Sequence, residues 1–282
     1  SKNSKSKKSL RIEVDSSMLD IQFIEDSVKG NIQLQYFPFT KIRYIYSKVN
    51  FLKDLKGLLK GNFIISGTRK DPRIIGNLWL FDGKFQYADK LFLTTKFELV
   101  HGQFHFREGE LTGDDEMIAQ SDHFMISKDT LTGEISGSGV DAFYIPLAYN
   151  WLTDKVKGSF SYKMSLSGRF HNPYLHWKIL GINGDFWYFY FDKLDMDLVF
   201  HNHYFSFPSY QLIKDNKYLI KGKGIVYNVF GNSSAWKEDM GFTFQFDNYF
   251  NGDLLSLVPR FRPEEYHKGE GFGEGRMKFS GN

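Results

Sequence analysis

Residues Gly57–Phe85 read GLLKGNFIISGTRKDPRIIGNLWLFDGKF, and residues Gly158–Phe186 read GSFSYKMSLSGRFHNPYLHWKILGINGDF. A shift of 101 positions superimposes the two stretches without a gap, so that Pro72 falls on Pro173. Self-similarity at a fixed period is the sequence signature of a repeat architecture. The chain is therefore predicted to be a tandem repeat.

The repeat divides the chain into five segments. We expect a flexible basic tail at 1–9, N-terminal strands and a connector helix at 10–56, repeat 1 at 57–157, repeat 2 at 158–270 and the start of a truncated third repeat at 271–282. Because the third copy is partial and the chain begins with Ser1, we expect a segment of a longer array, forming one continuous elongated body.

Composition excludes several classes of protein. The net charge is only +3 and its visible excess lies in the first nine residues, so nucleic-acid binding is a weak interpretation. A basic arm on anionic lipid headgroups and a solvated tail are both open. The chain has no cysteine, which excludes disulfides and thiolate metal sites. No apolar run approaches the length that crosses a bilayer, and no signal peptide precedes the first strand.

Hydrophobic periodicity predicts mostly strands. Apolar and polar residues alternate over Ile12–Val14, Leu19–Phe23 and Ile32–Tyr36, and again in both repeats, where Asp71-Pro72 and Asp82-Gly83 are predicted turns. Three segments are instead predicted as short helices or helix-like connectors. They are Val49–Leu59, Leu147–Val156 and Gly252–Val258. Repeat 1 also has an insertion between Leu111 and Gly137, predicted to be a loop, after which Gly137-Ser138-Gly139 matches Gly222-Lys223-Gly224.

A long sheet with one apolar face cannot leave that face in water, because apolar burial contributes about 25 cal/mol per Å². Aromatic residues make up 18% of the chain, including 29 Phe, which is more apolar surface than turns require. The sheet must therefore curl. It either closes into a packed sandwich or solenoid, or stays open as a trough that holds something other than protein.

The repeated stretch, at Gly57–Phe85 and again at Gly158–Phe186, resembles the repeats of TamB and, more broadly, the AsmA-like bridge proteins of bacterial envelopes. The residues that carry the resemblance are Gly61, Phe63, Ile65, Ser66, Gly67, Thr68, Pro72, Gly76, Leu78, Leu80, Asp82 and Gly83, and in the second copy Ser167, Gly168, Pro173, Asn183 and Gly184. The second copy departs from the pattern at Arg169 and at Trp177, which either narrows the trough or packs.

The resemblance implies an all-β fold, an elongated repeat sheet curled into a U-shaped, taco-like trough with an apolar interior and short connector helices. It also implies a periplasmic location, a parent anchored in the inner membrane, phospholipid movement between the two membranes, and support of outer-membrane protein assembly with a TamA-type barrel partner. Burying an acyl CH₂ is worth about 0.8 kcal/mol, so a continuous apolar floor removes the barrier to moving a lipid through water.

We expect phospholipid acyl chains to contact the side chains that alternation and repeat register place on the trough interior. They are Phe63, Ile65, Leu78, Leu80, Phe160, Tyr162, Met164, Leu166, Ile179, Met196, Leu198 and Phe200. The alternative hypothesis is a structural or adhesive β-solenoid that binds glycans or proteins through exposed aromatic residues.

No residue pattern predicts an active site, a cofactor or a metal centre. The pairs His101 with His105 and His201 with His203 lack further ligands at the spacing of a known zinc or iron site. Asp195 and Asp197 share a strand face and are interpreted as a solvated row rather than a hydrolytic pair. Residues 114–116, Asp-Asp-Glu, lack the spaced ligands of a calcium loop. The aromatic run Phe186–Phe191 breaks the alternation and is open to two interpretations, a lipid-facing patch or a core strand beneath a connector.

Overall fold

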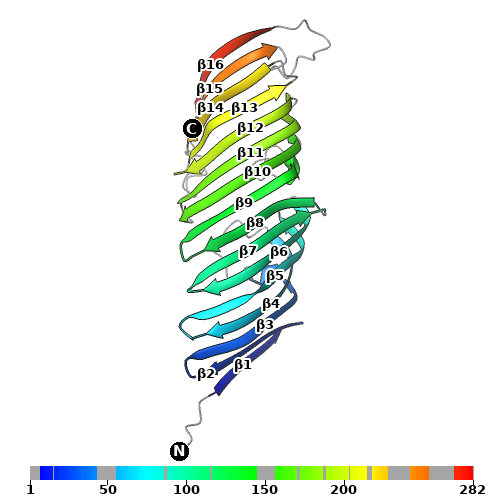
Figure 1. The fold of residues 1–282 in the computed structure, drawn as a ribbon, viewed down its shortest axis with the longest axis vertical. Helices are drawn as coiled ribbons and strands as arrows, with labels where there is room; N and C mark the ends of the chain where they lie inside the picture. Colours follow the sequence, from blue (N-terminus) through cyan, green and yellow to red (C-terminus); the bar gives the residue numbers. More distant parts are fainter. Residues whose placement is uncertain are drawn as a thin grey trace, which may run out of the picture. The chain divides into compact units, whose positions relative to one another are not determined.

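The computed structural model describes residues 7–14, 16–42, 55–85, 88–114, 116–144, 156–169, 172–186, 189–202, 204–214, 218–227, 242–253 and 270–281. The chain forms two compact units, an N-terminal unit (Ser1–Ile135) and a C-terminal unit (Ser136–Asn282). Both units are built from antiparallel β-strands, so the predicted all-β class is confirmed (Figure 1).

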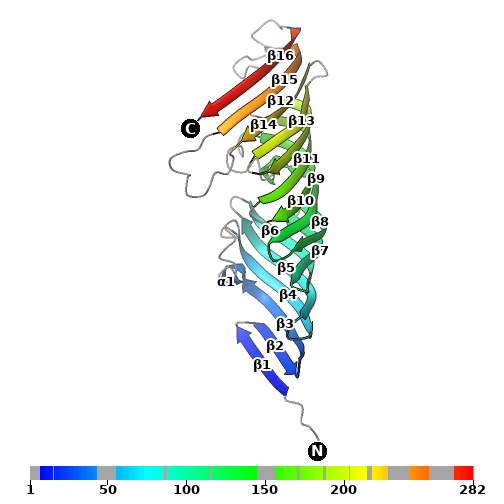
Figure 2. The same ribbon diagram turned by 90° about the vertical axis from the view of Figure 1, so that its left-hand side faces the viewer.

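The N-terminal unit is a meander in which hydrogen-bonded neighbours follow one another in chain order. Its strands are β1 (Lys7–Val14), β2 (Ser17–Ile24), β3 (Ser27–Pro38), β4 (Leu55–Gly67), β5 (Pro72–Phe85), β6 (Ala88–Val100), β7 (Gln103–Gly113) and β8 (Glu116–Ile126). The four-residue helix α1 (Phe39–Ile42) follows β3 and packs against β4 and β3 (Figure 2).

The C-terminal unit has the same meander order. Its strands are β10 (Val156–Arg169), β11 (Asn172–Phe186), β12 (Phe189–His201), β13 (Tyr204–Lys214), β14 (Tyr218–Tyr227), β15 (Phe242–Asp253) and β16 (Glu270–Gly281). The strand β9 (Thr130–Asp141) spans the division between the units and leads into the 3-10 turn η2 (Ala142–Tyr144), which packs against β10.

Strand bounds follow the repeat seen in the sequence. Both ends of β6 and β12 differ by 101 positions, and so do both ends of β7 and β13. The backbone is also repeated, since Gly67 and Gly168 have φ of 100° and 97° at the ends of β4 and β10. A positive φ of this size favours glycine because it has no Cβ, which explains why both copies carry Ser-Gly there.

The predicted turn at Asp82-Gly83 is wrong. Both residues lie inside β5, where the pairing register with β6 shifts between Leu80 and Gly83. Asp82 has a φ of 48° and its repeat equivalent, Asn183, has 49°. Asp and Asn tolerate this left-handed conformation better than most residues. The repeated Asp/Asn-Gly pair therefore marks a β-bulge, and the chain reverses later, where Phe85 pairs with Ala88.

The predicted connector helices are not found where the structure describes the chain. Leu55–Leu59 lies in β4, so the helix prediction is wrong over these residues, and Val49–Asp54 lies outside the described residues. Gly252 and Asp253 belong to β15, and Val156 begins β10. The remaining parts of these two predicted connectors, 147–155 and 254–258, also fall outside the described residues.

Two further expectations are corrected. Residues Lys7–Ser9, predicted as part of a flexible tail, belong to β1. The insertion predicted to be a loop contains the strand β8. The Gly-x-Gly match suggested that β14 corresponds to β9. In the strand order, however, β14 follows β13 as β8 follows β7, so β14 corresponds to β8.

Candidate functional site

In the N-terminal unit, apolar side chains form rows that cross the strands. The register of β3 to β8 places Ile32, Phe63, Gly76, Phe97, Phe106 and Phe124 in one such row. The ring centroids of Phe63 and Phe97 are 5.6 Å apart, and so are those of Phe97 and Phe106. A Cβ at Gly76 would lie 2.7 Å from the Phe63 ring, so glycine makes room for the ring above it. We call the side that carries this row the apolar face.

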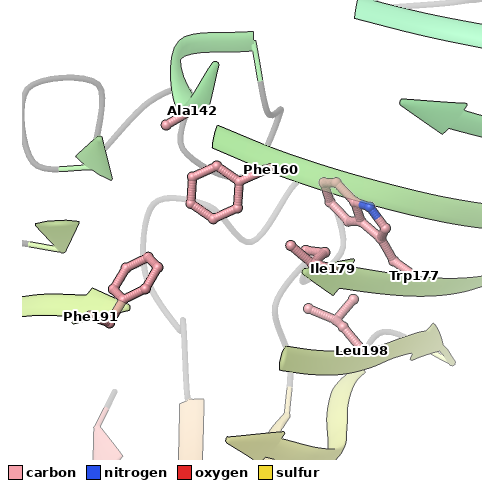
Figure 3. Close-up of a cluster of buried hydrophobic side chains, with 6 residues drawn as sticks. All are labelled: Ala142, Phe160, Trp177, Ile179, Phe191 and Leu198. Carbon is pink, nitrogen blue, oxygen red and sulfur yellow. The ribbon is translucent and has the colours of Figure 1, made fainter. Parts of the chain in front are cut away.

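The apolar face of the C-terminal unit contains a buried cluster. Figure 3 shows its six side chains, which are Ala142, Phe160, Trp177, Ile179, Phe191 and Leu198. Phe160, Ile179 and Leu198 come from the consecutive strands β10, β11 and β12, whereas Ala142 comes from η2. Since Ala142 is only 1% exposed, η2 covers part of this face with protein.

The twelve predicted lipid-contacting residues divide into two groups by burial. Seven are buried, namely Phe63, Ile65, Leu80, Phe160, Ile179, Leu198 and Phe200. Five are half-buried, namely Leu78, Tyr162, Met164, Leu166 and Met196. Register brings members of the set together, since Tyr162 pairs with Ile179 and Ile179 pairs with Met196. The half-buried members are the ones with side-chain surface open to a ligand.

Sequence reasoning missed several buried residues on this side. Leu59 is 4% exposed, and the shift of 101 superimposes it on Phe160, so the repeat register carried a signal that the apparent helical spacing hid. Leu91 and Phe191 are 6% and 3% exposed, and they pair with Gly83 and Gly184, the glycines at the bulges of β5 and β11. A bulge moves a residue by one position, so simple alternation does not identify these two.

Trp177 packs in the core rather than standing free above the face. It is 4% exposed, and its ring makes an edge contact with Tyr162 at 6.0 Å between centroids. Its Nε1 has no hydrogen-bond partner, which is unusual for a buried indole N–H. Burial also raises the pKa of Tyr162 to about 12.

The opposite, polar face of β5 to β8 carries a network of charged groups. Arg73 on β5 donates to the Glu98 carboxylate on β6 at 2.7 Å, and Arg107 on β7 lies 3.8 Å from the same group. The hydrogen bond from Arg73 is the main cause of the lowered pKa of Glu98. These groups tie neighbouring strands together.

His101 and His105, one of the two pairs considered in the sequence, have separate partners. His101 contacts Asp71 at 2.7 Å, whereas His105 hydrogen-bonds His123 at 3.0 Å with nearly parallel ring planes. His203 lies outside the described residues. Within the described ranges, no three His, Asp or Glu side chains come together as metal ligands.

Two of the carboxylate candidates have basic partners. Asp197 hydrogen-bonds His176 on the polar face, while Asp195 is exposed. Asp114 forms an ion pair with Lys90 at 3.0 Å, and Asp115 lies outside the described residues.

The aromatic run Phe186–Phe191 is part of a hairpin rather than one core strand. Phe186 ends β11 and pairs with Phe189, which begins β12, while Trp187 and Tyr188 lie outside the described residues. Among the large apolar side chains that the structure describes as exposed, the aromatic ones are Tyr36 and Tyr174.

In the described part of the chain, no helix has both the length and the apolar character needed to cross a membrane. Comparisons with protein-family models, curated proteins and solved structures find no match to this chain.

Proposed function

We propose that the chain conducts phospholipid acyl chains along the apolar face of its sheet. The observation that carries the proposal is that apolar residues form rows across consecutive strands in both units. Leu59, Leu80 and Leu93 form one such row in the N-terminal unit. Tyr162, Ile179 and Met196 form one in the C-terminal unit. A row that repeats from strand to strand offers an acyl chain a series of similar positions, and burial of each CH₂ contributes about 0.8 kcal/mol. The lipid meets no single deep site.

In this proposal the sheet curls into a trough with an apolar interior, and the chain is a segment of a TamB/AsmA-like bridge in the periplasm. The parent protein is anchored in the inner membrane, moves phospholipid toward the outer membrane, and works beside a TamA-type barrel. The repeated Ser-Gly and Asp/Asn-Gly pairs, which mark the same strand end and the same bulge in both copies, support a repeating structural unit.

The test is mass spectrometry of organic extracts from the purified, detergent-free chain, with a soluble protein of similar size as the blank. Met164→Asp places a charge on the apolar face at a half-buried position. Ile182→Asp is the matched control, because Ile182 is a 49% exposed residue of the neighbouring strand β11. Leu198 is unsuitable, since a carboxylate in place of a 1% exposed side chain would unfold the sheet.

We expect the unmodified chain and Ile182→Asp to retain phospholipid, and Met164→Asp to lose most of it while keeping its circular dichroism spectrum. Leu78→Asp and Ile64→Asp provide the same contrast in the N-terminal unit, where Ile64 is 63% exposed. Absence of lipid above the blank, or equal loss in the variants of both faces, contradicts the proposal. Either result favours a face filled by protein and the structural or adhesive hypothesis.

A further inference from the structure

The buried cluster of the C-terminal unit contains a hydrogen-bond donor that the fold does not use. Trp177 lies beside Leu198, and its Nε1 is buried although no described residue accepts its proton (Figure 3). Thr95, a buried polar residue that pairs with Leu78 in the N-terminal unit, has the Arg107 carbonyl as an acceptor at 3.1 Å. A buried donor without an acceptor loses its hydration and gains nothing in return, so the indole N–H requires an explanation.

The repeat explains the size of the Trp177 side chain but not its nitrogen. The shift of 101 superimposes two rows of cross-strand neighbours, which are Phe63, Gly76 and Phe97 in the N-terminal unit and Met164, Trp177 and Leu198 in the C-terminal unit. The large ring of Trp177 compensates for neighbours that are smaller than phenylalanine. Another apolar side chain of suitable size would do the same without burying a polar atom.

The surroundings of the indole favour a neutral acceptor. Its neighbours in the cluster are apolar, among them Ile179 and Phe160. Burial raises the pKa of Tyr162, whose ring contacts Trp177, to about 12, so a negative charge is disfavoured here. A phosphate would lose its hydration at this position, whereas a carbonyl oxygen loses less and still accepts a hydrogen bond. Phospholipids carry such oxygens in the esters that join the acyl chains to glycerol.

We propose that the Trp177 indole N–H donates a hydrogen bond to an ester carbonyl of the phospholipid on the apolar face. The inference rests on the proposed function and adds that the C-terminal unit recognises the ester region of the lipid as well as its acyl chains. The ester reaches Nε1 by displacing Met164, a flexible, half-buried side chain that pairs with Trp177 across β10 and β11. A single hydrogen bond is a shallow preference, so it does not trap the lipid.

The test compares two phosphatidylcholines of the same chain length, one with ester-linked and one with ether-linked chains. The diether has no carbonyl oxygen for the indole. The detergent-free chain is incubated with vesicles that contain both lipids in equal amounts, re-isolated and extracted for mass spectrometry. We expect it to retain about fivefold more diester than diether, the ratio that corresponds to one hydrogen bond of about 1 kcal/mol.

Trp177→Phe keeps an aromatic ring and removes the donor, so we expect this variant to retain the two lipids in nearly equal amounts. Phe191→Leu is the matched control. It reduces a buried ring of the same cluster and leaves the indole N–H in place, so we expect it to keep the fivefold preference. Circular dichroism checks that both variants keep the fold.

The outcomes separate this inference from the function on which it rests. Retention of neither lipid contradicts the proposed function, and with it this hydrogen bond. Retention of both lipids without preference by the unmodified chain overturns the hydrogen bond alone, whether or not Trp177→Phe folds. An unchanged preference in Trp177→Phe assigns the selectivity to another donor and overturns the role of Trp177. Equal loss of preference in Trp177→Phe and Phe191→Leu assigns it to packing of the cluster, which also overturns the proposal.

Discussion

His123 lies on the polar face of β8, where its imidazole hydrogen-bonds His105 at 3.0 Å. Its pKa is lowered from 6.5, first by desolvation and then by the positive charges of His105 and Arg107. A lowered pKa means that the folded protein binds this proton less readily than the unfolded chain does. The contribution of His123 to stability is therefore fully present above pH 6.5 and is lost as the pH falls through the folded-state pKa.

We predict that His123 contributes a slight decrease to the urea midpoint of the unmodified chain between about pH 7.5 and pH 5.5, where a histidine titrates. His123→Gln should show a smaller decrease over the same interval, because the variant has no group that titrates at this position. Glu98 does not disturb the comparison, since its pKa is lowered from 4.5 and its effect falls at more acidic pH. Equal decreases in both proteins would show that His123 contributes no pH dependence.

At the scale of the element, the β4–β5 hairpin depends on the backbone of Gly67. Its φ is 100°, and a Cβ at this position would lie 2.6 Å from the carbonyl oxygen of Asp71. The turn that follows is closed by hydrogen bonds from the Thr68 amide to the Asp71 carbonyl and from the Asp71 amide to the Thr68 hydroxyl. A side chain at Gly67 therefore strains the segment that sets the strand register.

We predict that Gly67→Ala lowers the free energy of unfolding by about 1–3 kcal/mol, the usual cost of a strained backbone position. The matched control is Gly109→Ala in β7, where the nearest atom to a new Cβ would be 3.7 Å away and φ is not left-handed. We expect a change within about 0.5 kcal/mol there. Urea denaturation measures both variants, and similar losses in the two would show that the φ of Gly67 is not limiting.

The strands also show how much of this fold the sequence predicts. Alternation and the shift of 101 predict the strands, and they predict the sheet face on which Phe63, Ile65 and Leu80 lie. They do so because apolar and polar residues must alternate along a strand that is buried on one face. They fail at bulges. The register shifts between Lys56 and Leu58, so the leucines of β4 no longer alternate and mimic helical spacing. An Asp-Gly pair favours a turn and a bulge for the same reason, its tolerance of positive φ, and only the pairing partner distinguishes the two.

In the molecule as a whole, the contacts that stabilise the fold join neighbouring strands. In each unit the extensive contacts between described elements join strands that are consecutive in the chain, apart from the packing of α1 and η2. Stability in such an arrangement is approximately a sum of strand terms and nearest-neighbour terms, as in repeat proteins. A cavity in one strand should therefore affect its neighbours and weaken with distance along the sheet.

Leu198→Ala tests this expectation, because Leu198 is 1% exposed in β12 and packs in the cluster with Trp177 and Ile179. Removing a fully buried leucine to alanine costs about 2–5 kcal/mol through lost burial and the cavity left behind. We predict that hydrogen exchange followed by mass spectrometry shows faster exchange in β11, β12 and β13, with protection of β4 to β6 in the N-terminal unit unchanged. Uniformly faster exchange through both units would mean that the whole chain unfolds as one cooperative body, and the nearest-neighbour description would then be wrong. Ile182→Ala, at a 49% exposed site of β11, should leave exchange unchanged throughout and exclude an effect of substitution itself.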